Sequence, residues 1–294
     1  MCRGERRSPH KRLSIKFTIY NNIATIEMKF KIITSHSNPF ILKIVSLHTH
    51  KGREREGAFL AEGFSIVEDA LSSACRVRTL IIRNDMLENK RTKFLLKKAE
   101  KKVIKTIVVS EKVFQKITTR ETPQGIAAEI EEPILPPWEK ALPHGLLLMV
   151  ERLQDPRNAG LLLRTSLAAG VNAVFLTRDS VDPFHPISVQ TSMGAVLHLP
   201  VYTKVDPIRL IDCVHASGGE AYAAMPGGTI DMRKWNPSAS LQLLVFGNES
   251  RGVSDTVRET CNGTISIPIF GKVESLNIAV AAGILCYQFK TTKK

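Results

Sequence analysis

The chain has 294 residues, of which 43% are hydrophobic and 23% charged, and both values are ordinary for a folded globular protein. Its length favours two domains, and no apolar run reaches the roughly 18 residues that a membrane helix requires, so we expect no membrane partner. Lysine and arginine outnumber aspartate and glutamate by 41 to 28. The excess lies mainly in residues 1–60, which carry 12 basic and 4 acidic groups, whereas residues 141–294 carry 14 and 12. A basic front end favours a polyanionic partner, although a solubilising surface explains it equally well and an anionic membrane less well.

The five cysteines include no pair with Cys-x-x-Cys spacing. An odd number of cysteines without such spacing indicates a protein of a reducing compartment and argues against a disulfide framework. It also argues against a structural zinc site. The eight histidines form no His-Glu-x-x-His motif. We therefore expect no metal.

The first 27 residues are rich in arginine, lysine and serine. This bias is typical of an organellar transit peptide, but a non-native extension or an upstream start codon produces it equally often. We expect residues 1–32 to be an extension, either disordered or a non-native start, outside the folded domains. A cytoplasmic protein is favoured over an organellar one.

Residues 33–130 are predicted to form a small α/β domain. A basic helix is predicted over residues 90–102, and strands over residues 77–82, 106–110 and 127–130. A further helix is predicted from apolar residues at roughly helical spacing, namely Phe59, Ile66, Val67, Ala70 and Leu71.

Prolines between residues 133 and 143 interrupt any helix or strand ladder, so we expect a linker over residues 131–143. Residues 144–294 then alternate between apolar strands and helices, which predicts an α/β fold with a mostly parallel sheet covered on both faces. Strands are predicted over residues 146–150, 171–177, 201–205, 220–225, 241–246 and 264–269. Helices are predicted over residues 159–169, 187–197, 207–216 and 276–290.

Polar and glycine residues cluster where three of these strands end, which is the edge at which open α/β sheets bind ligands. Residues 151–160 lead into a helix that carries Arg164, which we expect in its first two turns, and Asn158 is a candidate cap of that helix. In residues 246–252 two glycines flank polar groups. In residues 267–277, Ser275 and Asn277 precede the last helix, where they would cap it or touch a ligand. Taken singly, each segment is also compatible with an ordinary turn or capped helix. Dinucleotide, phosphate-loop and serine-hydrolase motifs are missing.

Together, the three segments resemble the signature motifs of the SpoU (TrmH) branch of the SPOUT RNA methyltransferases. The likeness is carried by Asn158, Gly160, Arg164 and Thr165, then by Gly247, Asn248, Glu249 and Gly252, and then by Ile267, Pro268, Gly271, Ser275, Leu276 and Asn277. The front of the chain is similar to the substrate-binding domain often fused to this branch, which resembles RNA-binding ribosomal proteins. That likeness is carried by Thr34-Ser35, Asn38-Pro39, Lys51-Gly52-Arg53, Glu62-Gly63 and Thr122-Pro123-Gln124-Gly125.

The resemblance implies a SPOUT catalytic domain with a C-terminal trefoil knot, the cofactor S-adenosyl-L-methionine, and a homodimer whose active site lies between subunits. It assigns the cofactor to backbone groups around Gly247, Ile267 and Leu276. It makes Arg164 the central catalytic group. The residues that position Arg164 and the nucleotide or order the loop are Asn158, Glu249, Ser275 and Asn277.

The expected reaction is transfer of a methyl group to a ribose 2′-hydroxyl of structured RNA. Ribosomal RNA of the 23S type is favoured, because relatives that act on transfer RNA usually carry short helical extensions in place of the front domain. Transfer RNA stays an alternative substrate. A relative that binds RNA without catalysis is the alternative from another functional class.

Overall fold

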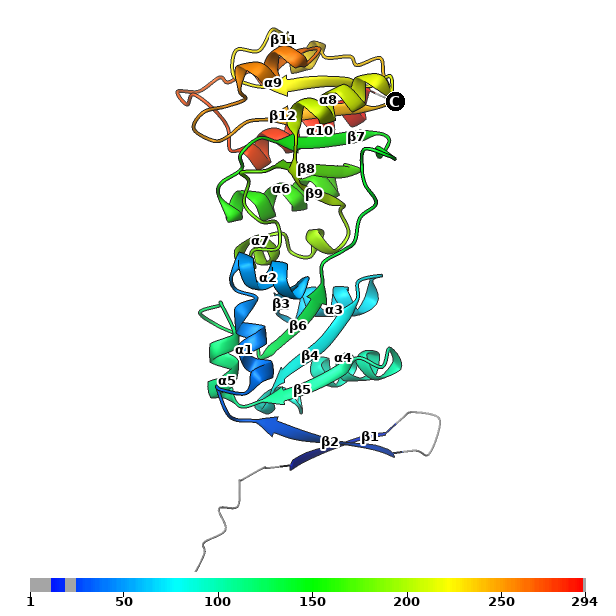
Figure 1. Ribbon diagram of the computed structural model, residues 1–294, viewed down its shortest axis with the longest axis vertical. Helices are drawn as coiled ribbons and strands as arrows, with labels where there is room; N and C mark the ends of the chain where they lie inside the picture. Colours follow the sequence, from blue (N-terminus) through cyan, green and yellow to red (C-terminus); the bar gives the residue numbers. More distant parts are fainter. Residues whose placement is uncertain (1–11, 19–24, 293–294) are drawn as a thin grey trace, which may run out of the picture. The chain divides into compact units, whose positions relative to one another are not determined.

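The computed structural model describes residues 12–18 and 25–292 and divides the chain into two compact units, residues 1–132 and 133–294 (Figure 1). Each unit is built on its own β-sheet. We call them the front unit and the back unit.

The front unit contains a six-stranded mixed sheet with the order β1-β2-β5-β4-β6-β3. Its strands are β1 (Arg12–Thr18), β2 (Thr25–Ile33), β3 (Ala58–Glu62), β4 (Val77–Arg83), β5 (Lys105–Val109) and β6 (Ile126–Glu131). Its α-helices are α1 (Pro39–Ser46), α2 (His50–Glu56), α3 (Phe64–Ser72), α4 (Lys90–Lys101) and α5 (Glu111–Ile117). The predictions for β4, α4, β5 and β6 are confirmed to within one residue at each end.

Of the two alternatives for residues 1–32, disorder is wrong for the described part of that range, and a non-native start stays an untested expectation. Residues 12–18 and 25–32 lie in β1 and β2, which pair antiparallel, and β2 joins the sheet where Ile32 and Ile33 pair with β5. The strand signal was present in the sequence, because Leu13, Ile15 and Phe17 alternate with polar residues. Residues 1–11 and 19–24, which the expectation also covered, lie outside the described residues.

The helix predicted from Phe59 to Leu71 is wrong at its start. Phe59 lies in β3, whose five residues are all buried, and α3 begins only at Phe64. Gly63, with φ of +107°, turns the chain between the two elements. A strand buried on both faces shows no alternation of apolar and polar residues, so periodicity alone cannot separate it from a helical face.

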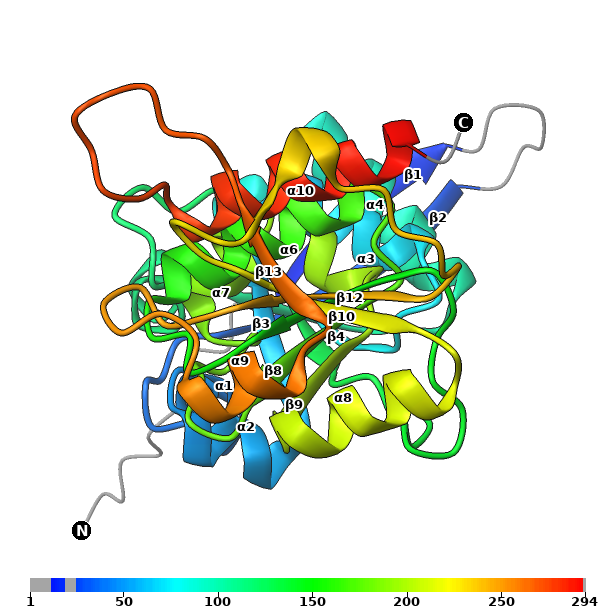
Figure 2. The same ribbon diagram turned by 90° about the horizontal axis from the view of Figure 1, so that it is seen from above.

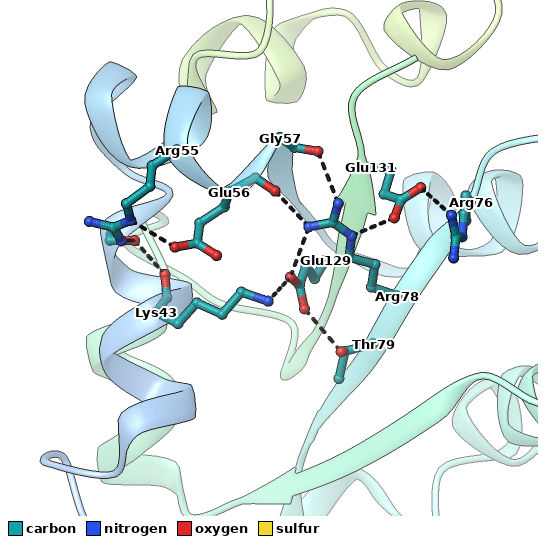
Figure 3. Close-up of polar contacts among 10 residues, drawn as sticks. Lys43, Arg55, Glu56, Gly57, Arg76, Arg78, Thr79, Glu129 and Glu131 are labelled. Atoms are coloured by element: carbon teal, nitrogen blue, oxygen red, sulfur yellow. Dashed lines mark hydrogen bonds and ion pairs between the residues drawn. The ribbon is translucent and has the colours of Figure 1, made fainter. Parts of the chain in front are cut away.

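Helices cover both faces of the front sheet, with α1 against α5 and α3 against α4. A buried carboxylate also links α1 to the sheet through an ion pair and a hydrogen bond (Figure 3). Glu129 of β6 lies 2.5 Å from the Nζ of Lys43 on α1 and accepts a hydrogen bond of 3.0 Å from Thr79 on β4. The Arg78 guanidinium lies 3.8 Å from Glu129 and donates to Glu131 and to the backbone carbonyls at the end of α2.

The back unit contains a seven-stranded sheet with the order β11-β13-β10-β12-β7-β8-β9, and every neighbouring pair is parallel. Its strands are β7 (Leu146–Val150), β8 (Ala173–Thr177), β9 (Val201–Val205), β10 (Glu220–Ala224), β11 (Ile230–Asp231), β12 (Gln242–Phe246) and β13 (Gly263–Ser266). Its α-helices are α6 (Pro156–Ala168), α7 (Pro186–Thr191), α8 (Pro207–Ala216), α9 (Asp255–Thr260) and α10 (Ile278–Thr292). The predicted parallel α/β sheet is confirmed.

Helices cover both faces of this sheet as well, and Figure 2 shows α10 and α8 on opposite sides of the strands. On one face α8 and α9 pack over Leu147, Met149 and Phe175. On the other face α6 packs between α7 and α10. The single helix predicted over residues 187–197 is instead α7 and a short 3-10 helix, because Met193 and Gly194 adopt φ values of +50° and +97°.

The predicted linker over residues 131–143 is only partly free of structure. Glu131 ends β6, and Trp138 is buried in the back unit with its ring edge against Phe175 at 6.0 Å between centroids. Glu139 lies 3.8 Å from Arg209 of α8. The second half of the segment is therefore packed on the back unit.

Candidate active site

The helix that follows β7 begins earlier than the sequence indicates. Asp155 caps α6 by accepting a hydrogen bond of 2.7 Å from the backbone N–H of Arg157, and Pro156 is the first helical residue. The prediction that Asn158 is the cap is therefore wrong. Asn158 lies in the first turn of α6, where its amide is available for contacts with other loops.

Three side chains from distant parts of the sequence meet at this end of α6. The Nδ2 of Asn158 donates to Glu249 at 3.1 Å, and the Nδ2 of Asn277 donates to the Oδ1 of Asn158 at 2.8 Å. Glu249 follows β12, and Asn277 precedes α10. We call Asn158, Glu249 and Asn277 the polar triad. It lies at the carboxyl ends of parallel strands, where ligands bind in this architecture.

Asn277 has a second role. Its Oδ1 accepts a hydrogen bond of 2.9 Å from the backbone N–H of Ala279, so the predicted cap of the last helix is confirmed for this residue. One amide thus fixes the start of α10 and orients Asn158.

The loop after β12 is held by hydrogen bonds to its own backbone. Asn248 and Gly252 exchange backbone hydrogen bonds of 3.1 and 2.8 Å, and the Nδ2 of Asn248 donates to the carbonyl of Arg152 at 2.8 Å. A Cβ at Gly247 would lie 1.9 Å from the backbone of Gly252. Glycine is therefore needed at residue 247 for the loop to close on itself, whatever it binds.

Two residues outside the predicted set shape the same edge. Glu151 is buried and accepts a hydrogen bond of 2.8 Å from the backbone N–H of Ser254. Arg152 adopts φ of +55°, rare for a residue other than glycine, and its guanidinium lies 3.1 Å from Glu151. The available sequence signal was the position of a charged pair directly after an apolar strand.

Arg164 and Ser275 are not joined to the triad. Arg164 is the ninth residue of α6 and so lies in its third turn, not in the first two, about 9 Å along the axis from Asn158. Both side chains are exposed, and neither makes a hydrogen bond or ion pair with any residue the structure describes. The structure thus gathers three of the five expected catalytic residues by direct contact.

The residues expected to hold the cofactor offer backbone groups. Gly247, Ile267 and Leu276 are half-buried, and within residues 12–18 and 25–292 their backbone N–H and C=O groups make no hydrogen bond. The adenine edge and the amino-acid groups of S-adenosylmethionine need hydrogen-bond partners, which these backbone groups can supply. Its apolar surface can be covered by the side chains of Ile267 and Leu276. The residues therefore fit this cofactor.

Two cysteines of the back unit are poor nucleophiles. Burial raises the pKa of the Cys261 and Cys286 thiols to about 12. Among the described residues, no group of three or more His, Cys, Asp or Glu side chains is placed to hold a metal ion. In that same part of the chain, no helix is both long and apolar enough to cross a membrane.

Comparison with known proteins identifies a family for each of the two units. Residues 145–287 match the SpoU rRNA Methylase family, and residues 38–128 match the MRM3-like substrate binding domain. The 23S rRNA (guanosine(2553)-2′-O)-methyltransferase RlmP of Bacillus subtilis is 32% identical over 88% of this chain and 99% of its own length. A tRNA/rRNA methyltransferase of Synechocystis sp. is 32% identical over 87% of this chain and 92% of its own.

Solved structures share the fold over most of the chain. The AdoMet-bound rRNA methyltransferase of Sinorhizobium meliloti superposes with a TM-score of 0.78 at 28% identity, covering 88% of this chain and 97% of that one. The SpoU methyltransferase AviRb of Streptomyces viridochromogenes in complex with AdoMet gives 0.75 at 25% identity, covering 85% and 96%.

A parallel α/β unit with polar loops at its strand ends, joined to a second α/β unit, defines a two-domain RNA methyltransferase. The chain belongs to the SpoU rRNA methylase family. It is an RNA 2′-O-methyltransferase that uses S-adenosylmethionine, and the expectations of family, reaction and cofactor are confirmed.

Proposed function

We propose that this enzyme methylates the 2′-hydroxyl of a guanosine in the RNA of the large ribosomal subunit. RlmP of Bacillus subtilis and RlmB of Xanthomonas axonopodis are both named as 23S rRNA guanosine-2′-O-methyltransferases. The match of residues 38–128 to a substrate binding domain supports a large RNA substrate. The observation that carries the catalytic part of the proposal is the polar triad.

The triad and the backbone groups have separate roles in this proposal. When bound, S-adenosylmethionine supplies a methyl group on a positively charged sulfur. Gly247, Ile267 and Leu276 hold it through their backbone groups and side chains. Asn158 and Glu249 orient the target nucleotide, since each is fixed by a neighbour of the triad. Alignment of this kind supplies several kcal/mol of catalysis in favourable cases.

Arg164 acts on the RNA in this proposal. A guanidinium stays protonated at any ordinary pH, so it binds the phosphate next to the reacting ribose and steers the 2′-hydroxyl toward the methyl group. The proton of that hydroxyl then leaves to the neighbouring phosphate, because a protonated guanidinium cannot accept it. Ser275, exposed in the loop before α10, contacts substrate or orders this loop.

A homodimer explains why Arg164 lies apart from the triad. On the same exposed side of α6, Leu161 and Leu167 are 41% and 38% exposed. On α10, which packs against α6, Val280 and Tyr287 are 51% and 54% exposed. Exposed apolar side chains on these two packed helices, together with an arginine that has no partner among the described residues, suit an interface with a second copy. We propose that this interface brings Arg164 toward the triad of the partner.

The trefoil knot is a further part of the proposal. In the strand order, β10, β12 and β13 lie on one side of β7, and β8 and β9 lie on the other. The last helix, α10, follows β13 in the chain, yet it packs against α6, the helix that directly follows β7. This return of the last helix supports a chain that passes through an earlier loop. We also propose that the enzyme acts in the cytoplasm.

The test combines cofactor binding with methyl transfer. Isothermal titration should show about one S-adenosylmethionine per subunit. Purified enzyme with labelled S-adenosylmethionine should methylate protein-free large-subunit RNA, and nuclease mapping should place the label on one guanosine ribose. Methylation of transfer RNA alone would refute the proposed substrate. Cofactor binding without transfer to either RNA would favour the non-catalytic alternative.

A further inference from the structure

The solvent-facing side of α4 in the front unit is a stripe of three lysines and one phenylalanine. α4 buries the apolar side of its helix, namely Thr92, Leu95, Leu96 and Ala99. Lys90, Phe94, Lys97 and Lys101 are spaced i, i+4, i+7 and i+11, which places them on the opposite side. All four are exposed, and Phe94 is 49% exposed. We call these four residues the α4 stripe.

The lysines of the α4 stripe have no partner within the described chain. The side chains of Lys90, Lys97 and Lys101 make no hydrogen bond or ion pair with any described residue, although those of other basic residues of α4 do. Lys93, for example, lies 2.5 Å from Glu88, and Lys98 donates to Ser72. The three charges are therefore available to an external partner.

Phe94 is held in place although it faces solvent. The Nζ of Lys98 lies 4.6 Å from the centre of its ring. A cation over one face of the ring leaves the other face free for a flat partner. An exposed aromatic ring between lysines is the arrangement that binds a nucleobase by stacking and its phosphates by charge.

Several charges of α4 work against the stability of the helix, although Lys98 and Lys101 in its last turn favour it. Its first turn contains Lys90 and Arg91 and no acidic residue, although the positive end of the helix dipole favours acids there. Lys93, Lys97 and Lys101 are spaced i, i+4 and i+8, and like charges four residues apart destabilise a helix. A surface that only needed to be soluble would mix both signs. Glu100, the one acidic residue of α4, lies outside the α4 stripe, so the stripe carries positive charge alone. This single sign indicates a polyanionic partner.

We propose that the α4 stripe docks the RNA substrate, with its lysines on backbone phosphates and Phe94 stacked on an unpaired base. The inference rests on the proposed function, since it names the surface by which the front unit holds the RNA. The stripe spans about 16 Å, enough to meet more than one phosphate. An anionic membrane fits less well, because a single apolar side chain gives little to insert.

The test compares full-length variants in filter binding to protein-free large-subunit RNA over a salt series. Lys97→Gln with Lys101→Gln should weaken binding about tenfold at low salt and reduce the slope of log affinity against log salt by about two, because each phosphate contact adds about one. The matched control is Lys112→Gln with Lys116→Gln on α5, two exposed lysines also four residues apart. The control should bind like the unchanged protein.

Phe94 separates stacking from charge. Phe94→Ala should weaken binding by roughly tenfold without changing the salt slope, and Phe94→Trp should bind normally. The lysine variant should unfold at the same or a slightly higher temperature and keep its affinity for S-adenosylmethionine, which excludes misfolding. Unchanged RNA affinity in the lysine and Phe94→Ala variants, or an equal loss in the α5 control, would overturn the proposal.

The same series on transfer RNA distinguishes this inference from the proposed function. If the unchanged protein binds only transfer RNA, the proposed ribosomal substrate fails, while the effect of the α4 variants on transfer-RNA binding still decides the role of the stripe. If it binds neither RNA, both proposals fail.

Discussion

The polar residues of the site differ in how firmly the protein holds them. Asn158 is fixed between Glu249 and Asn277, and Asn277 is itself fixed by the start of α10. Arg164 has no such partner among the described residues. A preorganised group stabilises charge at a set position, whereas an exposed guanidinium can follow a phosphate that arrives with the substrate. The two parts of the site therefore suit different steps, alignment of the nucleotide and capture of its backbone.

Arg164→Ala should leave the affinity for S-adenosylmethionine within about twofold, because Arg164 contacts none of the cofactor residues. It should reduce methyl transfer by roughly a hundredfold or more, since misplacing the reacting oxygen by about 1 Å costs that much. Arg164→Lys should also reduce methyl transfer strongly, because lysine lacks the planar guanidinium that binds phosphate through two hydrogen bonds. Isothermal titration and single-turnover transfer measure the two effects.

Arg258→Ala is the control, because Arg258 lies on α9 and forms only exposed ion pairs. It should transfer methyl groups at the normal rate. Near-normal turnover in the Arg164 variants would place catalysis elsewhere.

At the scale of elements, α6 and α7 approach each other through Gly160. A Cβ on this residue would lie 1.9 Å from the Oγ1 of Thr191 and 2.5 Å from the carbonyl of Ser188. Gly160→Ala should therefore force the helices apart and lower the free energy of unfolding by about 1–3 kcal/mol. Gly271→Ala is the matched control, since its Cβ meets nothing within 4 Å. Equal unfolding temperatures for the two variants in calorimetry would contradict this packing role.

The buried carboxylate of Glu129 gives a second prediction for the elements. Lys43→Met leaves Glu129, 1% exposed, with only Thr79 and the more distant Arg78. Removing one partner of a buried ion pair lowers the free energy of unfolding by about 3–5 kcal/mol. Because Lys43 is partly exposed, we expect a smaller loss of about 2 kcal/mol. Arg55→Ala breaks the exposed pair with Glu56 and an exposed hydrogen bond of 3.0 Å to the Oγ of Ser46, and it should cost less than about 1 kcal/mol. Hydrogen exchange of β4 and β6 should report the difference, and equal protection in both variants would refute it.

Sequence patterns located the elements of the back unit better than those of the front unit. β7, β9 and α8 have the predicted bounds. β7 is a continuous apolar run because it is buried along its whole length, and a proline marks the start of α8. α1, α2 and α5 have seven or eight residues each, too few for a clear helical period, so they were not predicted. Their caps, Asn38, Thr49 and Ser110, were the available signal.

The three residues of the polar triad could be named from the sequence, but the contacts between them could not. The motifs named Asn158, Glu249 and Asn277 as site residues. Their hydrogen bonds join positions 91 and 119 residues apart, and no local pattern specifies such pairs. Glu151 and Arg152 were not predicted as site residues. The role of Glu151 depends on its burial and that of Arg152 on its positive φ, and both properties appear only in the folded chain.

At the scale of the whole molecule, charge and chemistry lie in different units. Residues 1–132 carry 26 basic and 15 acidic groups, a net +11, whereas residues 133–294 carry 15 and 13, a net +2. The signature motifs all lie in the back unit. Attraction of RNA phosphates by the front unit would raise the local concentration of substrate without placing charge next to the cofactor.

A protein of residues 133–294 should therefore bind S-adenosylmethionine and dimerise like the full chain but lose most of its RNA affinity. It begins at residue 133 because Trp138 is part of the back-unit core. Counterion release makes the affinity contributed by the front unit fall steeply with salt, so the remaining binding should show a smaller salt slope. Filter binding of both proteins to the same large-subunit RNA fragment measures affinity and slope together, and ultracentrifugation measures assembly. Equal affinities with equal slopes would mean that the back unit binds the RNA by itself. A monomeric fragment would mean that α6 and α10 alone are not enough to form the dimer interface.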